Sequence, residues 1–160
     1  MADFRDIKNE FKLIAEAQTG ISSFEYGRKF ELNAYRNNAV PIFLLFKQPT
    51  ISPLNRTRKK KVYSVQFGIY TTYTEAERVA GTEYEDKQAD LENLAEQFLR
   101  ELYNRSIGNT AESTSTKDWI ISDEVSGIFQ EQVGVDGLVG LEITIPMEVF
   151  SDCDEGTFSY

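Results

Sequence analysis

The sequence predicts an α+β fold in which a mainly antiparallel sheet carries two helices packed on one face. Two segments repeat apolar residues at three- and four-residue steps, which is the spacing of an amphipathic helix. Other segments are short and either wholly apolar or alternating, which is typical of strands. The order is helix, strands, long helix, strands, and one sheet covered by both helices is the simplest packing for it.

The first helix is expected to begin near Phe4, where an apolar stripe starts that continues through Ile7, Phe11 and Ile14. Gly20 is a suitable residue for its end. Acidic residues near its start favour the positive end of the helix dipole. This helix is expected to cover the core.

The second helix, residues 85–105, is the strongest element that the sequence predicts. Its polar side is acidic, because residues 83–101 contain seven acidic and two basic side chains. Glu92 and Glu96 lie on that side and are candidate interaction residues. The apolar stripe consists of Leu91, Leu94, Ala95, Phe98 and Leu102.

Strands are expected at seven places. The run 40–46 is apolar throughout, which indicates a strand covered on both faces, with Pro41 at its start or at a sheet edge. Residues 61–70 alternate and predict a half-buried strand. Gly27 and Arg28 are a candidate turn, and the stretch 71–82 fits either a loop or an early helical turn. The seven expected strands are residues 23–26, 29–33, 40–46, 61–70, 119–121, 128–132 and 138–150.

The last strand, residues 138–150, is longer than the usual five or six residues. Its end is therefore expected to project beyond the sheet. Pro146 cannot donate a hydrogen bond to a neighbouring strand, so that part is expected at an edge or a bulge.

We expect one α+β domain, residues 1–150, followed by an acidic C-terminal tail, residues 151–160. A chain of 160 residues is long enough to bury a sizeable core without disulfides or metals. The tail is too polar to fold alone. It is either disordered or an arm that orders on a neighbouring molecule, with Phe158 and Tyr160 as anchors.

The sequence lacks the side chains on which most catalytic sites depend. It has no histidine, and its one cysteine, Cys153, lies between two aspartates that disfavour the thiolate. Gly134, Gly137 and Gly140 lead into a strand, so they do not form a phosphate-binding loop; they indicate a hairpin turn and a close backbone approach.

The carboxylates Asp152, Asp154 and Glu155 form part of a calcium-loop pattern, but the other ligand positions and the following helix are missing. We therefore expect no catalytic residue, no cofactor and no metal, and a protein that is not an enzyme. The alternative is an enzyme that uses carboxylates and no histidine for catalysis.

The net charge of −9 disfavours general binding to nucleic acid. The longest apolar run is far shorter than the roughly 20 residues that a membrane helix needs, and the N-terminus lacks the pattern of a signal peptide. We expect a soluble protein made in the cytosol, with no membrane partner.

One segment is basic although the chain as a whole is acidic. It lies mostly within an expected loop, residues 49–60, and ends just after it. It can be a solvated hairpin tip, a docking finger for an acidic surface, or a contact for DNA that passes through a pore. The acidic helix of a neighbouring copy offers such a surface, and a contact of this kind can close a ring. The basic residues are Arg56, Arg58, Lys59, Lys60 and Lys61.

Three segments together resemble tail-completion or tail-terminator proteins of tailed bacteriophages, those of crAss-like phages among them. The first is the N-terminal helix that leads to Phe24-Glu25-Tyr26-Gly27-Arg28-Lys29-Phe30-Glu31-Leu32-Asn33 and Val40-Pro41-Ile42-Phe43-Leu44. The second is Asp86-Lys87-Gln88-Ala89-Asp90-Leu91 through Leu102. The third is Gly140-Leu141-Glu142-Ile143-Thr144-Ile145-Pro146-Met147 with Cys153.

This resemblance implies a small subunit that forms a sixfold or twelvefold ring in the phage neck, or at the head-proximal end of the tail. Such a ring joins the tail tube to the connector. Its partners would be copies of itself and neighbouring neck and tail proteins, with passive contact to DNA in the lumen. The implied location is the virion, after synthesis in the host cytoplasm. The alternative is a cytosolic protein-binding or regulatory module that acts through its exposed sheet face.

Overall fold

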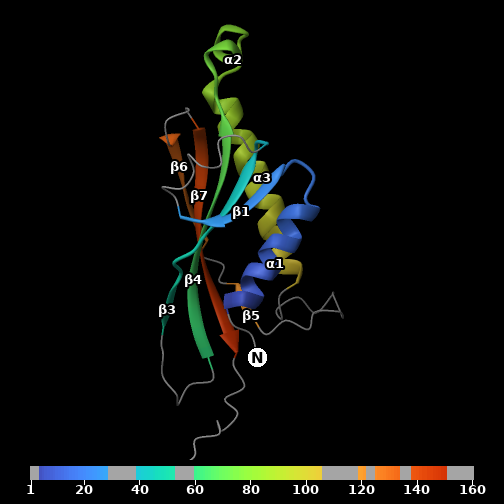
Figure 1. Ribbon diagram of the computed structural model, residues 1–160, viewed down its shortest axis with the longest axis vertical. Coiled ribbons are helices and arrows are strands. Elements are labelled where there is room, and N and C mark those ends of the chain that lie inside the picture. Colours follow the sequence, from blue (N-terminus) through green and yellow to red (C-terminus); the bar gives the residue numbers. More distant parts are fainter. Residues whose placement is uncertain are drawn as a thin grey trace, which may run out of the picture.

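The computed structural model describes residues 4–28, 39–52, 60–105, 119–121, 125–133 and 138–150. The α+β fold is confirmed, and the molecule is elongated (Figure 1). In chain order the elements are α1 (Phe4–Ala17), β1 (Ser23–Gly27), β2 (Ile42–Phe46), β3 (Thr50–Ser52), β4 (Lys60–Thr72), α2 (Glu75–Val79), α3 (Tyr84–Asn104), β5 (Trp119–Ile121), β6 (Ser126–Val133) and β7 (Leu138–Phe150).

The seven strands of the described ranges form one sheet in the order β1-β2-β4-β7-β5, with β3 also pairing with β4 and β6 with β7. Every pair is antiparallel except β1 with β2. The centre of the sheet is the pair β4 and β7, in register from Lys60 opposite Phe150 to Thr72 opposite Leu138. The mainly antiparallel sheet is therefore confirmed, with one parallel edge strand.

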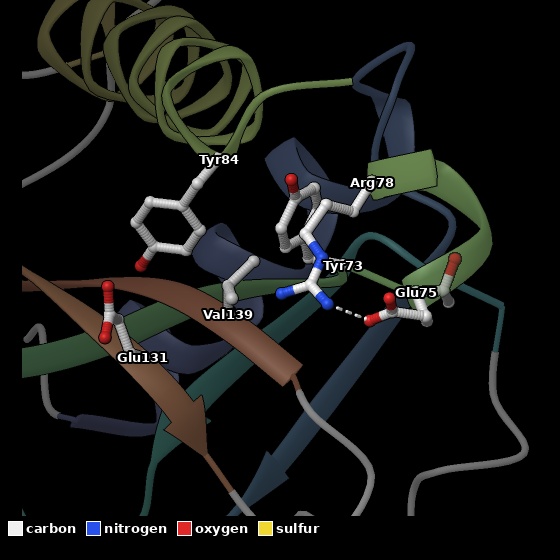
Figure 2. A pocket seen from close by; sticks show the side chains of 7 residues that line it. Tyr73, Glu75, Arg78, Tyr84, Glu131 and Val139 are labelled. Atoms are coloured by element: carbon white, nitrogen blue, oxygen red, sulfur yellow. Dashed lines mark hydrogen bonds and ion pairs between the residues drawn. The ribbon is translucent and has the colours of Figure 1, made fainter. Parts of the chain in front are cut away.

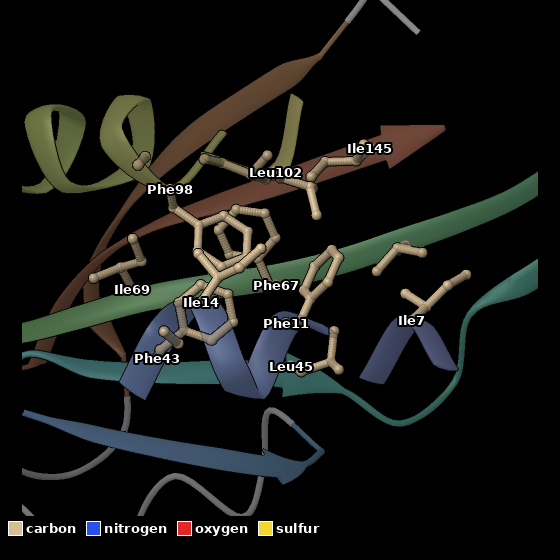
Figure 3. Close-up of a cluster of buried hydrophobic side chains, with 14 of the residues drawn as sticks. Ile7, Phe11, Ile14, Phe43, Leu45, Phe67, Ile69, Phe98, Leu102 and Ile145 are labelled. Atoms are coloured by element: carbon tan, nitrogen blue, oxygen red, sulfur yellow. The ribbon is translucent and has the colours of Figure 1, made fainter. Parts of the chain in front are cut away.

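The helices α1 and α3 both pack on one face of this sheet, as predicted (Figure 1). Their apolar stripes meet a cluster of aromatic rings (Figure 3). The Phe98 ring of α3 lies 5.1 Å from the Phe11 ring of α1 and 4.7 Å from the Phe43 ring of β2, measured between centroids. Phe43 also stacks on Phe67 of β4 at 4.7 Å. These four rings join both helices to the middle of the sheet.

Polar contacts fix the two long helices to each other. Glu10 of α1 is buried, and its Oε1 accepts a hydrogen bond of 2.8 Å from Nη1 of Arg105, just beyond α3. Arg105 also donates from Nε to Glu101 at 3.0 Å. Just beyond the C-terminal end of α1, the Gln18 amide donates to the Leu94 carbonyl at 2.9 Å. A buried carboxylate persists in a protein where such a partner compensates for its lost hydration.

The expectation that the last strand projects beyond the sheet is wrong. β7 is an interior strand, because β4 pairs with its whole length on one side while β6 and β5 share the other. In the described ranges β6 is in register with positions 138–144 and β5 with positions 147–149. Pro146 falls between them, where neither strand needs its missing N–H.

Strand 61–70 was expected to be half-buried, but its second half is buried on both faces. Gly68 and Tyr70 point away from the helices, and the Tyr70 side chain is fully buried beside Leu44 and Leu138. The Tyr70 ring lies over Gly68 and over Gly140 on β7. The close backbone approach predicted for the glycines 134, 137 and 140 is thus seen at Gly140, where the approaching group is an aromatic ring; Gly134 and Gly137 lie outside the described residues.

Three shorter segments differ from the predictions. The expected loop 49–60 contains β3, which pairs with β4, so only residues 53–59 separate the two strands. The candidate turn at Gly27 is wrong, because Gly27 is the last residue of β1 and accepts a hydrogen bond from the Lys47 amide at 3.0 Å. The stretch 71–82 completes β4 and then forms α2, capped by the Thr74 side chain. The predicted strand 29–33 lies outside the described residues.

Candidate functional site

Most of the predicted interaction residues lie outside the part that the structure describes. Lys60 is the first residue of β4, and Lys61 follows it with its Nζ 5.7 Å from the centre of the Tyr63 ring. Glu92 and Glu96 are both described, and both are exposed on α3. The residues outside the described ranges are Arg56, Arg58, Lys59, Phe158 and Tyr160.

Glu92 and Glu96 form one rim of a groove between α3 and β6. The groove has a volume of about 290 Å³. Its floor is apolar, since it is lined by Ala95 and Leu99 of α3 and by Leu141 and Ile143 of β7. The two carboxylates are four residues apart, so they follow each other along the same side of the helix. A groove with an apolar floor and a negative rim suits a partner that carries both apolar and basic groups.

The opposite rim of the groove is β6, which sequence reasoning had not assigned to a site. Gly127 and Phe129 line the groove, and Phe129 is 39% exposed. Ile128 points to the other face of the sheet and is 61% exposed. Within the described residues β6 pairs with β7 alone, so its outer edge carries backbone groups without a strand partner. We name this edge together with the groove the α3–β6 surface.

A sequence signal for this surface exists. Ile128 and Phe129 are adjacent large apolar residues in a strand whose other residues, apart from Val133 at its end, are small or polar. Neighbouring side chains of a strand point to opposite faces, so one of the two must lie on the face without helices. The pattern therefore indicates an apolar group that intramolecular packing leaves exposed.

A second pocket, of about 450 Å³, lies near α2 and the beginning of α3 (Figure 2). The rings of Tyr73 and Tyr84 meet edge to face at 5.8 Å between centroids. Burial, and then the charge of Glu131, raise the pKa of Tyr84. Figure 2 shows the Tyr84 hydroxyl directed toward the Glu131 carboxylate of β6, and the Arg78 guanidinium near the Tyr73 ring.

The polar groups around this second pocket are engaged with one another. Arg78 pairs with Glu75 within α2, which raises the pKa of Arg78. Glu77 pairs with Lys87 of α3, and this contact lowers the pKa of Glu77. The Tyr73 hydroxyl donates to the Thr82 carbonyl at 2.7 Å. The Glu77–Lys87 pair attaches α2 to α3, and the other two contacts hold the α2 segment together. This arrangement indicates a structural role for the pocket and not a catalytic one.

The described residues contain no group of three or more cysteine, aspartate or glutamate side chains that could hold a metal ion. Asp152, Asp154 and Glu155 lie outside those residues, as does Cys153. None of the helices in the described ranges is long and apolar enough to cross a membrane. Among the described residues we take the α3–β6 surface as the candidate site, because the predicted residues Glu92 and Glu96 border its groove and Phe129 is exposed beside it.

Comparison with known proteins adds no assignment. The chain matches no protein-family model and no curated protein sequence.

Proposed function

We propose that this chain is a structural subunit that assembles head to tail with copies of itself. The observation that carries the proposal is the separation of two complementary charged features. The basic residues 56–61 follow β3 along the chain and continue into the start of β4, and the end of β3 and the start of β4 both lie at the lower end of the molecule in Figure 1. The α3–β6 surface lies in the upper half.

The strand register gives the distance between the basic segment and the α3–β6 surface. Lys60 pairs with Phe150 of β7, whereas Ile128 at the groove pairs with Glu142. Eight residues along an antiparallel strand span about 27 Å. Residue 56 is at most four residues from either bracketing strand, so it can extend about 14 Å from them. The basic segment cannot reach the acidic groove of its own subunit.

A contact between the two features must therefore join different copies, and it uses different patches on the two molecules. Repeated contacts of this heterologous type generate closed rings, or open filaments where the rotation does not close. The opposite charges favour this encounter over contacts between like surfaces.

The resemblance to tail-completion and tail-terminator proteins supports a more specific assignment. We propose that the assembly is a sixfold or twelvefold ring in the neck, or at the head-proximal end of the tail, of a bacteriophage. There it would join the tail tube to the connector and let DNA pass through its lumen. The proposed role is structural and not enzymatic, in agreement with a sequence that has no histidine.

Native mass spectrometry and negative-stain imaging of the purified chain test this proposal. We expect rings with a central channel from the wild type, either alone or with a neck partner. Serine at Arg56, Arg58, Lys59, Lys60 and Lys61 should leave a folded monomer at the concentrations at which the wild type assembles, because surface substitutions seldom cost much stability and the charge attraction is lost. A matched control loses five other exposed charges, by serine at Lys12, Arg28, Lys47, Arg78 and Arg100, and should still assemble.

Two results would contradict the proposal. One is a five-serine variant of the basic segment that forms rings as the wild type does. The other is a wild-type chain that stays monomeric at every concentration and with every neck partner. The second result would favour the regulatory module that acts through its exposed sheet face.

A further inference from the structure

We infer that the contact between copies is a strand addition: residues 56–58 of one subunit pair with the outer edge of β6 in the next. This inference rests on the proposed head-to-tail assembly and specifies how its two surfaces meet. It names a backbone contact and a register, neither of which follows from opposite charges alone.

The outer edge of β6 is exposed. Positions 126–129 are all exposed in the described structure, although they belong to a strand of eight residues. The other outer strands differ, because β1 is half-buried along most of its length and β3 has three residues. A long exposed edge with large apolar residues is a template for an additional strand, and extended peptides bind sheets in this way.

The spacing of the two glutamates on α3 matches the spacing of two arginines in an extended strand. Glu92 and Glu96 are four residues apart on α3, which corresponds to a rise of about 6 Å. Alternate residues of a strand are about 6.7 Å apart and point to the same face. Arg56 and Arg58 are such a pair, so a strand laid along β6 can direct both guanidinium groups to the two carboxylates.

This match of spacing imposes a register on the added strand. Gly127 and Phe129 lie on the helix side of the sheet, since they pair with Ile143 and Leu141 of the core. An added strand with its arginines on that side places Thr57 on the other side, opposite Ile128. The β-branched threonine then covers the exposed isoleucine, a favourable cross-strand pair.

The arginine stems would meet the groove floor in this arrangement. Phe129 offers a ring beside the path of the strand, and guanidinium groups bind well over aromatic faces. Gly127 has no side chain to block the adjacent position. The groove therefore accommodates two long basic side chains around one exposed aromatic ring.

The other strand that could pair with the outer edge of β6 is the β6 edge of a second copy. Such a symmetric pairing would bring the acidic rims of two α3 helices and two copies of Glu131 toward each other. Like charges close to a contact disfavour it. A basic strand has no such conflict, which is why the observations favour residues 56–58.

A charge-reversal mixture tests the arginine–glutamate contact. One variant carries Glu92→Lys and Glu96→Lys, and the other carries Arg56→Glu and Arg58→Glu. Each alone should need about 30-fold or more higher concentration to assemble, because every contact becomes repulsive. An equimolar mixture should assemble again, since alternating subunits restore opposite charges at every contact. Failure of the mixture, while wild type forms rings, would overturn the inference.

Disulfide trapping tests the strand register. With Cys153→Ser, the pair Thr57→Cys and Ile128→Cys should cross-link neighbouring copies under mild oxidation. Directly opposite residues of paired strands have Cα atoms about 4.5–5.5 Å apart, within the range for a disulfide. The matched control, Thr57→Cys with Phe129→Cys, places the second thiol on the other face and should not cross-link.

The outcomes separate the inference from the proposed function. Rings that form without the 57–128 cross-link refute strand addition and leave the head-to-tail assembly intact. Cross-linking by Ile128→Cys alone shows pairing of two β6 edges and also refutes it. A wild-type chain that never assembles refutes both.

Discussion

Replacement of Gly140 by alanine should destabilise the fold through the ring of Tyr70. A Cβ atom at Gly140 would lie 2.3 Å from Cδ1 and 2.6 Å from Cε1 of that ring. The ring has little freedom to move, because it is fully buried and its hydroxyl donates to Glu142 at 3.0 Å. Insertion of a methyl group into a well-packed core costs about 1–3 kcal/mol.

The backbone at Gly140 does not oppose alanine, since its φ lies outside the left-handed region. Without the clash, alanine would stabilise the protein by about 0.4–1 kcal/mol, because it reduces the entropy of the unfolded chain. The expected net loss is therefore about 1–2 kcal/mol. Urea denaturation measures it, with an unchanged m-value as the sign that the unfolded state is the same.

A matched control and a double-mutant cycle isolate the cause. Gly127→Ala adds a methyl group on the exposed β6, where the nearest atoms are 3.3 Å away, and should change stability by less than about 0.5 kcal/mol. In a Tyr70→Ala background, Gly140→Ala should be neutral or stabilising. A Gly140→Ala protein as stable as wild type, or an equal loss with and without the ring, would refute the reasoning.

Three further substitutions have defined expectations. Burial, reinforced by Glu142, raises the pKa of Tyr70 above its ordinary value of 10.0, so the folded state keeps its proton where the unfolded state loses it. The contribution of this proton to the free energy of unfolding is complete below pH 10 and falls by about 1.4 kcal/mol for each pH unit above it. Tyr70→Phe should remove this pH dependence in urea denaturation experiments at alkaline pH. Phe98→Ala should cost about 3–5 kcal/mol in the same assay, because the buried ring contacts three others, and a loss under 1 kcal/mol would contradict this packing. Phe129→Ser should leave the melting temperature within a few degrees and weaken assembly in native mass spectrometry; normal rings would exclude Phe129 from the contact.

The fold class could be predicted because the strongest patterns are local. The stripe of α3 and the alternation of β4 and β7 each lie within one segment, and burial of one face explains them. The same reasoning failed for the end of β7, which was expected to project beyond the sheet. Length indicates that a strand exceeds its neighbour, but it does not show that two short strands, β5 and β6, pair along one side of it.

The buried second face of β4 could not be predicted either. Alternation assigned Gly68 and Tyr70 to the polar side, because glycine and tyrosine are both tolerated at a surface. The structure shows that the ring fills the space over two glycines, and Gly140 comes from a strand about 70 residues away in the chain. Such a pair is visible only once the register is known.

The candidate site was predicted in part. Glu92 and Glu96 were identified from the charge of their helix, which is a local property. The groove that they border, and its opposite rim on β6, depend on which strand packs beside α3. The distance between the groove and the basic segment follows from the strand register. Contact between copies could therefore be inferred only once the fold was known.

The salt dependence of assembly should distinguish charge from backbone pairing at the α3–β6 surface. The electrostatic screening length is about 10 Å at 0.1 M salt and about 3 Å at 1 M. Glu92 and Glu96 are exposed, so two ion pairs to them should contribute modestly, and 1 M NaCl should raise the assembly concentration about tenfold.

Strand pairing and the contact with Phe129 do not depend on screening, so wild-type rings should persist at 1 M salt when the protein concentration is raised. Phe129→Ser combined with 1 M salt should remove them, because both contributions are then weakened. Light scattering across the two salt concentrations measures each case. Assembly that does not change between 0.1 M and 1 M NaCl would contradict a role for the two glutamates. Complete dissociation at every protein concentration in 1 M NaCl would contradict the strand contact.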